Sequence, residues 1–216
     1  MTDERGEMER LPDPHGHPPP DDDTPPGRHE LLAYAMKELL VEKGVLTNDD
    51  VRSQLETIDS WQSSKGAEIV ARAWTDADFK KLLLTDAADA VRDFNIDVGE
   101  VRLTAVENTD TVQNVLVCTL CSCYPRVLLG LPPDWYKSKN YRSRVVIEPR
   151  AVLREFGTDI PDDMTVRVHD SLADLRYLVL PRRPAGTEDW TAEQLAGIVT
   201  RDCLVGVVNP KVPENA

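Results

Sequence analysis

The sequence is short of the features that mark membrane, secreted and nucleic-acid-binding proteins. No stretch of the 216 residues approaches the roughly 18 consecutive apolar residues of a membrane-spanning helix. The N-terminus, MTDERGEMER, lacks the apolar segment of a secretory signal, so we expect a cytoplasmic protein. The chain has 25 basic and 38 acidic residues, and the resulting net charge of −13 would repel phosphate backbones. We therefore expect neither a membrane nor a nucleic acid as partner.

Cysteine is also scarce, and its placement says more than its number. Four cysteines in a chain with no export signal do not suggest a disulfide framework. Three of them, Cys118, Cys121 and Cys123, fall within six residues. In a cytoplasmic protein this concentration of thiols indicates metal binding or redox chemistry. No Ser-His-Asp triad and no phosphate-binding glycine loop accompanies the cluster.

Composition divides the chain into three parts. Residues 1–27 contain seven of the 16 prolines and the acidic run Asp21–Asp23, which predicts a disordered tail. Residues 28–98 show helical spacing of apolar residues and predict a helical arm that packs on its own domain or embraces a partner subunit. Residues 99–216 mix strand and helix patterns and predict a compact, layered α+β domain that binds the metal.

Individual elements follow from caps and apolar patterns. Gly44 is placed to end the first helix of the arm, and Thr47 to cap the second. Further helices are predicted at Ala67–Trp74, Asp76–Phe94, Arg150–Phe156 and Thr191–Thr200. Strands are predicted at Val101–Val106, Asn114–Val117, Arg144–Ile147, Thr165–His169, Arg176–Leu180 and Leu204–Val208.

The spacing C-x2-C-x-C directly follows an apolar strand and leaves two metal geometries open. Tetrahedral zinc usually takes its ligands in pairs from two chain segments, and no second cysteine pair exists, so zinc fits poorly. Three sulfurs and two deprotonated backbone amides from one loop can instead form an N2S3 claw with a sixth position open. Such strong anionic donors favour a small trivalent ion.

The segment CTLCSC, continued as CYP and then LGLPP, resembles the α subunit of nitrile hydratase and the related γ subunit of thiocyanate hydrolase. The resemblance covers roughly residues 30–210. It includes the segments Ala73–Thr75, Phe79–Lys81, Tyr141–Val146, Glu148–Arg150, Pro184–Thr187 and Val199–Asp202. It implies the α+β fold of the nitrile hydratase α chain, with a helical arm before the metal-binding domain.

The resemblance also implies a ligand set. Cys118, Cys121 and Cys123 would supply the sulfur ligands, and the main-chain nitrogens of Ser122 and Cys123 would complete the claw. In this family the second cysteine is oxidised to sulfinate and the third to sulfenate, which assigns those states to Cys121 and Cys123. Thr119 matches the cobalt class, where the iron class has serine, so non-corrin Co(III) is expected rather than Fe(III).

The implied activity is that of a hydro-lyase, which hydrates a nitrile C≡N bond to the amide. The Cys123 sulfenate would act as nucleophile or base, Cys121 would accept hydrogen bonds, and Ser122 would hydrogen-bond near the metal. Arginines of a β-type partner subunit would pair with the oxidised cysteines, and an activator protein would insert the metal.

Arg126 is the main departure from an ordinary nitrile hydratase, which carries tryptophan after Cys-Tyr-Pro. The γ subunit of thiocyanate hydrolase carries arginine there, and a guanidinium beside the metal suits an anionic substrate. The alternative function is therefore conversion of thiocyanate to carbonyl sulfide and ammonia. An alternative of a different class is a zinc-bound structural subunit without catalysis.

Overall fold

The computed structural model describes residues 27–59, 62–121 and 123–213. Helices α1 (Arg28–Glu42), α2 (Asn48–Asp59), α3 (Ser63–Thr75), α4 (Ala77–Thr85) and α5 (Ala87–Arg92) come first. Strands β1 (Arg102–Glu107) and β2 (Val112–Val117) follow, and then α6 (Arg126–Leu129), α7 (Asp134–Lys137), α8 (Lys139–Ile147) and α9 (Pro149–Glu155). After these come β3 (Thr165–Asp170), β4 (Leu175–Leu180), α10 (Ala192–Gly197) and α11 (Arg201–Val205).

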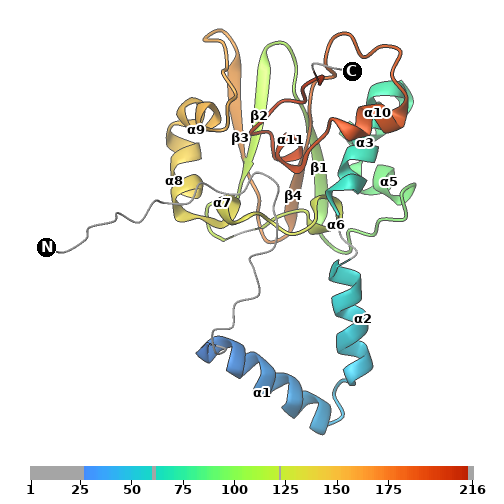
Figure 1. The fold of residues 1–216 in the computed structure, drawn as a ribbon, viewed down its shortest axis with the longest axis vertical. Helices are drawn as coiled ribbons and strands as arrows, with labels where there is room; N and C mark the ends of the chain where they lie inside the picture. The colour runs from blue at the N-terminus through green and yellow to red at the C-terminus, as the bar shows by residue number, and fades with distance from the viewer. Residues whose placement is uncertain (1–26, 60–61, 122, 214–216) are drawn as a thin grey trace, which may run out of the picture.

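The strands form two parallel pairs, as expected for an α+β fold. Strand β1 pairs with β4, and β2 pairs with β3 in a register that sets Val117 opposite Asp170. Because parallel strands end at the same edge, the loops that follow β2 and β3 lie side by side. Figure 1 shows the strands in the middle, with α8 and α9 on one side and α3, α5 and α10 on the other.

The core lies between the strands and the helices that cover them. Strand β2 is buried almost along its whole length, with the apolar run Val115–Val117 at its end and the buried polar residues Gln113 and Asn114 before it. Helices α4 and α5 pack against β1, α11 packs against β4, and α9 packs against β3. This packing fixes the end of β2, which is where the cysteine cluster begins.

Helices α1 and α2 lie apart from this body (Figure 1), whereas α3 packs against α6, α10 and α11. The expected helical region therefore behaves as two parts, and α3 to α5 belong to the body, where α4 and α5 cover β1. The large apolar side chains of α1 remain exposed, namely Leu31, Leu32, Tyr34, Met36 and Leu39. The expectation for residues 1–26 lies outside the described residues.

The two predicted turn signals of the arm are confirmed. Gly44 follows α1 with φ of +65°, a conformation that glycine adopts without strain. The Thr47 hydroxyl accepts a hydrogen bond from the backbone N–H of Asp50, whose carboxylate accepts from the Thr47 N–H. This reciprocal pair satisfies backbone donors at the start of α2.

Two predicted strands are wrong, because local caps override the β-branched residues. Arg144–Ile147 belongs to α8, where the Ser138 hydroxyl caps the helix by accepting from the Tyr141 N–H. Leu204–Val208 begins inside α11, which Thr200 caps at its start and Gly206 ends with φ of +88°.

The remaining element predictions differ less from the structure. The predicted long helix Asp76–Phe94 divides into α4 and α5, because the Asp86 carboxylate accepts from the Asp89 N–H and starts a new helix. The other four predicted strands are confirmed as β1 to β4. Within the described ranges, no helix is long and apolar enough to cross a membrane.

Candidate metal centre

The cysteine cluster lies on the loop that leaves β2, which we call the claw loop (residues 118–123). Cys118 directly follows the last residue of β2 and is 1% exposed, so the strand anchors the first sulfur in the core. Cys123 is partly buried and Cys121 is exposed. Leu120 at the loop's outer side is 85% exposed. The loop thus presents its sulfurs at the boundary between core and surface.

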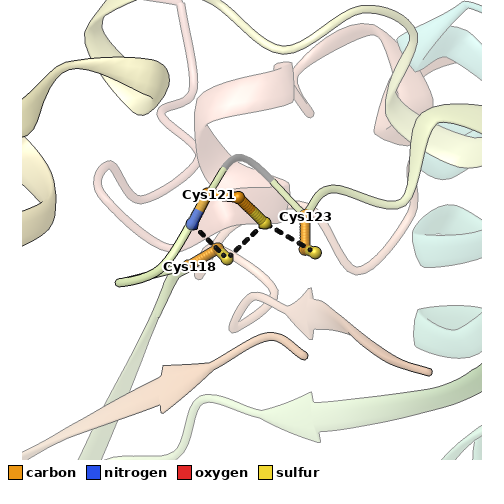
Figure 2. A group of neighbouring side chains, drawn as sticks. All are labelled: Cys118, Cys121 and Cys123. Atoms are coloured by element: carbon orange, nitrogen blue, oxygen red, sulfur yellow. Dashed lines mark hydrogen bonds between the residues drawn. The ribbon is translucent and has the colours of Figure 1, made fainter. Parts of the chain in front are cut away.

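The three sulfur atoms converge, as Figure 2 shows. The Sγ atoms of Cys118 and Cys121 lie 3.3 Å apart, and those of Cys121 and Cys123 lie 3.1 Å apart. All three lie within 4.8 Å of one another. These separations exceed the roughly 2.05 Å of a disulfide bond, so no disulfide joins the three cysteines.

The separations also distinguish between metal geometries. With a metal–sulfur bond of about 2.3 Å, sulfurs at adjacent corners of an octahedron lie about 3.3 Å apart, and those of a tetrahedron about 3.8 Å apart. The observed 3.1 and 3.3 Å match the octahedral value. The donor set therefore fits a small octahedral ion better than tetrahedral zinc.

Three neighbouring elements hold the backbone of the claw loop. Asp170, at the end of β3, accepts from the Thr119 N–H at 2.9 Å and from the Thr119 hydroxyl at 2.6 Å. Arg142 of α8 donates to the Cys121 carbonyl at 3.1 Å. Tyr136 of α7 donates to the Cys123 carbonyl at 2.9 Å. Because each partner comes from a separate element, the fold fixes the position of the sulfurs.

Burial shapes the protonation of this region. Desolvation and, after it, the hydrogen bond with Cys121 raise the pKa of the Cys123 thiol to about 12, although the guanidinium of Arg176 acts to lower it. Burial also raises the pKa of Tyr136, so its hydroxyl stays protonated and keeps its hydrogen bond to the claw loop. A bound cation would reverse the preference of the thiols for the protonated form, because coordination stabilises the thiolate.

A cavity of about 390 Å³ opens beside the claw loop. Cys121 and Cys123 line it, so two of the three sulfur-bearing residues face this space. Val98, Val101, Leu103, Tyr124, Pro125, Arg126, Val127 and Arg176 complete the lining. The cavity therefore combines an apolar wall with two arginines and two of the sulfur-bearing residues.

The structure brings together all the site residues predicted from the sequence that it describes. Cys118, Cys121 and Cys123 form the cluster, and Arg126 lines the cavity next to them. Ser122 lies outside the described residues. Across the described ranges, no other group of His, Cys, Asp or Glu side chains has a comparable metal-binding arrangement.

Two further residues of the sequence, His169 and Cys203, have structural roles away from the sulfurs. His169 Nε2 lies 2.8 Å from Asn114 Oδ1. The Cys203 thiol is buried in α11 and lies 3.3 Å from the Thr200 hydroxyl. Neither side chain belongs to the cluster.

Sequence reasoning missed Asp170, Arg142, Tyr136 and Arg176 as parts of the site. The available signal was position. Asp170 directly follows the predicted strand Thr165–His169, just as Cys118 follows the predicted strand Asn114–Val117, and parallel pairing brings such ends together. Arg176 lies on β4 opposite Leu103 of β1, and both line the cavity. Strand pairing reveals Asp170 and Arg176, whereas Arg142 of α8 and Tyr136 of α7 become visible only in the folded structure.

Comparisons with known proteins agree with this geometry. Residues 28–208 match the family described as nitrile hydratase, alpha chain. The chain is 48% identical over 205 residues to the low-molecular weight cobalt-containing nitrile hydratase subunit alpha of Rhodococcus rhodochrous, covering 93% of this chain and 99% of the relative. It is 42% identical over 194 residues to the thiocyanate hydrolase subunit gamma of Thiobacillus thioparus, covering 84% and 80%. A solved structure of recombinant thiocyanate hydrolase with partially modified cobalt centres superposes with a TM-score of 0.81 at 41% identity, covering 87% of this chain and 92% of that chain.

Proposed function

Because the chain belongs to the nitrile hydratase alpha-chain family, we propose that it is the metal-carrying subunit of a cobalt-type nitrile hydratase. The enzyme would add water to a C≡N bond and release the amide. The observation that carries this proposal is the convergence of three thiols on one loop, at 3.1 and 3.3 Å, beside a cavity.

The proposed ligands are the sulfurs of Cys118, Cys121 and Cys123 and the main-chain nitrogens of Ser122 and Cys123. Cobalt-containing relatives and Thr119 support cobalt, and we propose the trivalent, non-corrin ion. When bound, this ion would supply Lewis acidity to activate a nitrile or a water molecule.

The chain's own residues would position the substrate and move protons. We propose that Cys123 works as a sulfenate, whose oxygen faces the cavity and attacks the nitrile carbon or takes a proton from water. Cys121, as a sulfinate, would accept hydrogen bonds. The Tyr136 hydroxyl would keep Cys123 in place by donating a hydrogen bond to the Cys123 carbonyl. The hydroxyl of one water molecule ends on the carbon and its proton on the nitrogen, which gives the imidic acid that tautomerises to the amide. Where the sulfenate attacks first, this water displaces the sulfenate oxygen from the carbon and restores the sulfenate.

A partner subunit would complete the site. Oxidised cysteines form an anionic group whose burial needs cationic partners, and we propose that a β-type subunit supplies arginines for this purpose. Exposed apolar residues near the ends of β2 and β3 support a docking surface: Leu120 is 85% exposed and Leu172 is 45% exposed. We also propose that an activator protein inserts the metal. The cytoplasmic location expected from the sequence stays a prediction.

The test is to assemble the chain with its partner subunit and measure amide formation from a small aliphatic nitrile. Elemental analysis and the mass of the peptide that contains the claw loop should show cobalt, two added oxygens on Cys121 and one on Cys123. Zinc at full occupancy with unmodified cysteines would instead favour the structural subunit without catalysis.

Thiocyanate hydrolysis is the second candidate, and the position of Arg126 favours it. This guanidinium lines the cavity together with Cys121 and Cys123, where an anionic substrate would bind. The same assembled protein should therefore be incubated with thiocyanate. Ammonia release from thiocyanate, without amide formation from the nitrile, would assign the chain to that reaction.

A further inference from the structure

The cavity beside the claw loop has an unusual charge for a chain with a net charge of −13. Arg126 and Arg176 line it, and its lining contains no carboxylate. In the part of the chain that the structure describes, neither guanidinium forms an ion pair. Two arginines in one partly enclosed space that contains no carboxylate form a local site for an anion.

Arg176 is fixed in position before any ligand binds. Its Nη1 donates to the carbonyls of Leu172 and Leu175, the latter at 3.1 Å. These bonds tie the guanidinium to the start of β4, and the pairing of β4 with β1 sets Arg176 beside Leu103 of the cavity wall. A guanidinium held by main-chain carbonyls loses little freedom when it binds a carboxylate.

The rest of the cavity wall is apolar, and the cavity is larger than a triatomic anion needs. Val98, Val101, Leu103 and Val127 supply aliphatic surface. The volume of about 390 Å³ falls within the range of roughly 300–1,000 Å³ found for pockets that bind organic ligands. The best ligand therefore has an apolar body as well as a negative charge.

We propose that Arg176, together with Arg126, forms a subsite for a carboxylate group, and that the preferred substrates are nitriles that carry a carboxylate on an apolar body of ring size. The substrate assignment rests on the proposed nitrile hydratase function. It separates three parts of the cavity: the sulfurs next to the reacting cyano group, the aliphatic wall around the ring, and the two guanidinium groups around the carboxylate.

The first test compares 3-cyanobenzoate with benzonitrile in the assembled enzyme. The wild type should show the higher kcat/KM for 3-cyanobenzoate. Arg176→Gln should lower that kcat/KM at least about tenfold more than it lowers kcat/KM for benzonitrile, because only the carboxylate substrate loses a charge-assisted hydrogen bond. Arg154→Gln is the matched control, since it removes the same charge from an exposed position and should leave both values unchanged.

An equal loss on both substrates would overturn the subsite, because it would mean that Arg176 supports the cysteines or the fold rather than the carboxylate. If the glutamine variant assembles poorly, Arg176→Lys is the alternative, because it keeps the positive charge. The lysine variant should retain a preference for 3-cyanobenzoate, and a complete loss of preference in a well-assembled lysine variant would also overturn the proposal.

A binding measurement separates this inference from the proposed function. Isothermal titration of the assembled protein should show tighter binding of benzoate than of benzamide, and Arg176→Gln should remove the difference. If benzoate binds in this Arg176-dependent way but neither nitrile is hydrated, the subsite stands and the nitrile hydratase function falls. If both nitriles are hydrated but benzoate binds no better than benzamide, the function stands and the subsite falls.

Discussion

At the scale of single residues, the claw loop depends on side chains that come from outside it. Thr119 supplies both a backbone N–H and a hydroxyl to Asp170, and Arg142 donates to the Cys121 carbonyl. These contacts orient the loop without touching the sulfurs. Such supporting groups are known to alter metal affinity through the geometry of the ligands.

Replacing Asp170 with alanine should therefore weaken metal binding. The variant loses both hydrogen bonds to Thr119, and we expect the affinity of the claw loop for cobalt to fall by about tenfold to a hundredfold. Cobalt content after exposure to limiting metal measures the effect. Asp163→Ala is the control, because that exposed carboxylate lies in a turn away from the loop. Equal cobalt content in the two variants would contradict the supporting role of Asp170.

His169 makes stability depend on pH. Burial lowers its pKa, and the charge of Arg167 lowers it further, so the folded chain favours the neutral ring. The unfolded chain, with a histidine pKa of about 6.5, then binds more protons as the pH falls. The contribution of His169 to the stability of the folded chain is thus present above about pH 6.5 and is lost as the pH falls through the folded-state pKa.

The measurement compares thermal unfolding of the wild type and of His169→Gln at about pH 7.5 and about pH 5.5. Glutamine can still donate to Asn114, the partner of His169 Nε2, but does not titrate. The wild type should lose more stability than the variant between the two pH values. An identical loss in both proteins would show that another group causes the pH dependence.

At the scale of elements, α3 approaches its neighbours closely at a glycine. A Cβ atom added at Gly66 would lie 2.5 Å from Leu204 Cδ1 of α11 and 2.9 Å from the Leu128 carbonyl oxygen of α6. The side chain of Leu204 can adjust, but the backbone of α6 has little freedom to do so. Helix α3 therefore needs glycine at this point of contact.

Gly66→Ala should destabilise the protein by about 1–2 kcal/mol, because an overpacking cost of up to about 3 kcal/mol exceeds the roughly 1 kcal/mol by which alanine favours a helix. Gly197→Ala is the matched control, since it also adds a methyl group to a helical glycine but meets no atom within 4 Å. Chemical unfolding should show a loss for the first variant and no loss for the second. No loss in Gly66→Ala would contradict the close packing of α3.

The elements also show what the sequence can and cannot predict. Strands β1 to β4 were predictable because each is a short apolar or alternating run. The C-terminal half of α8 was not, because Val145 and its neighbours favour a strand, whereas the Ser138 cap and the burial of Tyr141 and Val145 on one face fix a helix.

The metal centre likewise has a part that the sequence predicts and a part that it does not. The three cysteines are close in sequence, so their spacing alone predicts a shared metal. Asp170 and Arg176 reach the loop only through parallel pairing of β2 with β3 and of β1 with β4, which the sequence does not specify. Contacts within one loop can thus be predicted, whereas contacts between paired strands need the structure.

At the scale of the whole molecule, the chain has the properties of one part of an assembly. Its net charge is −13, yet the cavity next to the cysteines carries two guanidinium groups. Helices α1 and α2 lie apart from the body, and α1 exposes Tyr34 and Met36. We propose that these helices bind a partner subunit. The domain boundary at residue 98 stays a prediction.

The most direct measurement of the metal centre is X-ray absorption at the cobalt edge of the purified, assembled protein. Three sulfurs held 3.1 and 3.3 Å apart on one loop predict a six-coordinate cobalt with three sulfur neighbours and lighter atoms at the other positions. A four-coordinate centre, or cobalt without sulfur neighbours, would contradict the account.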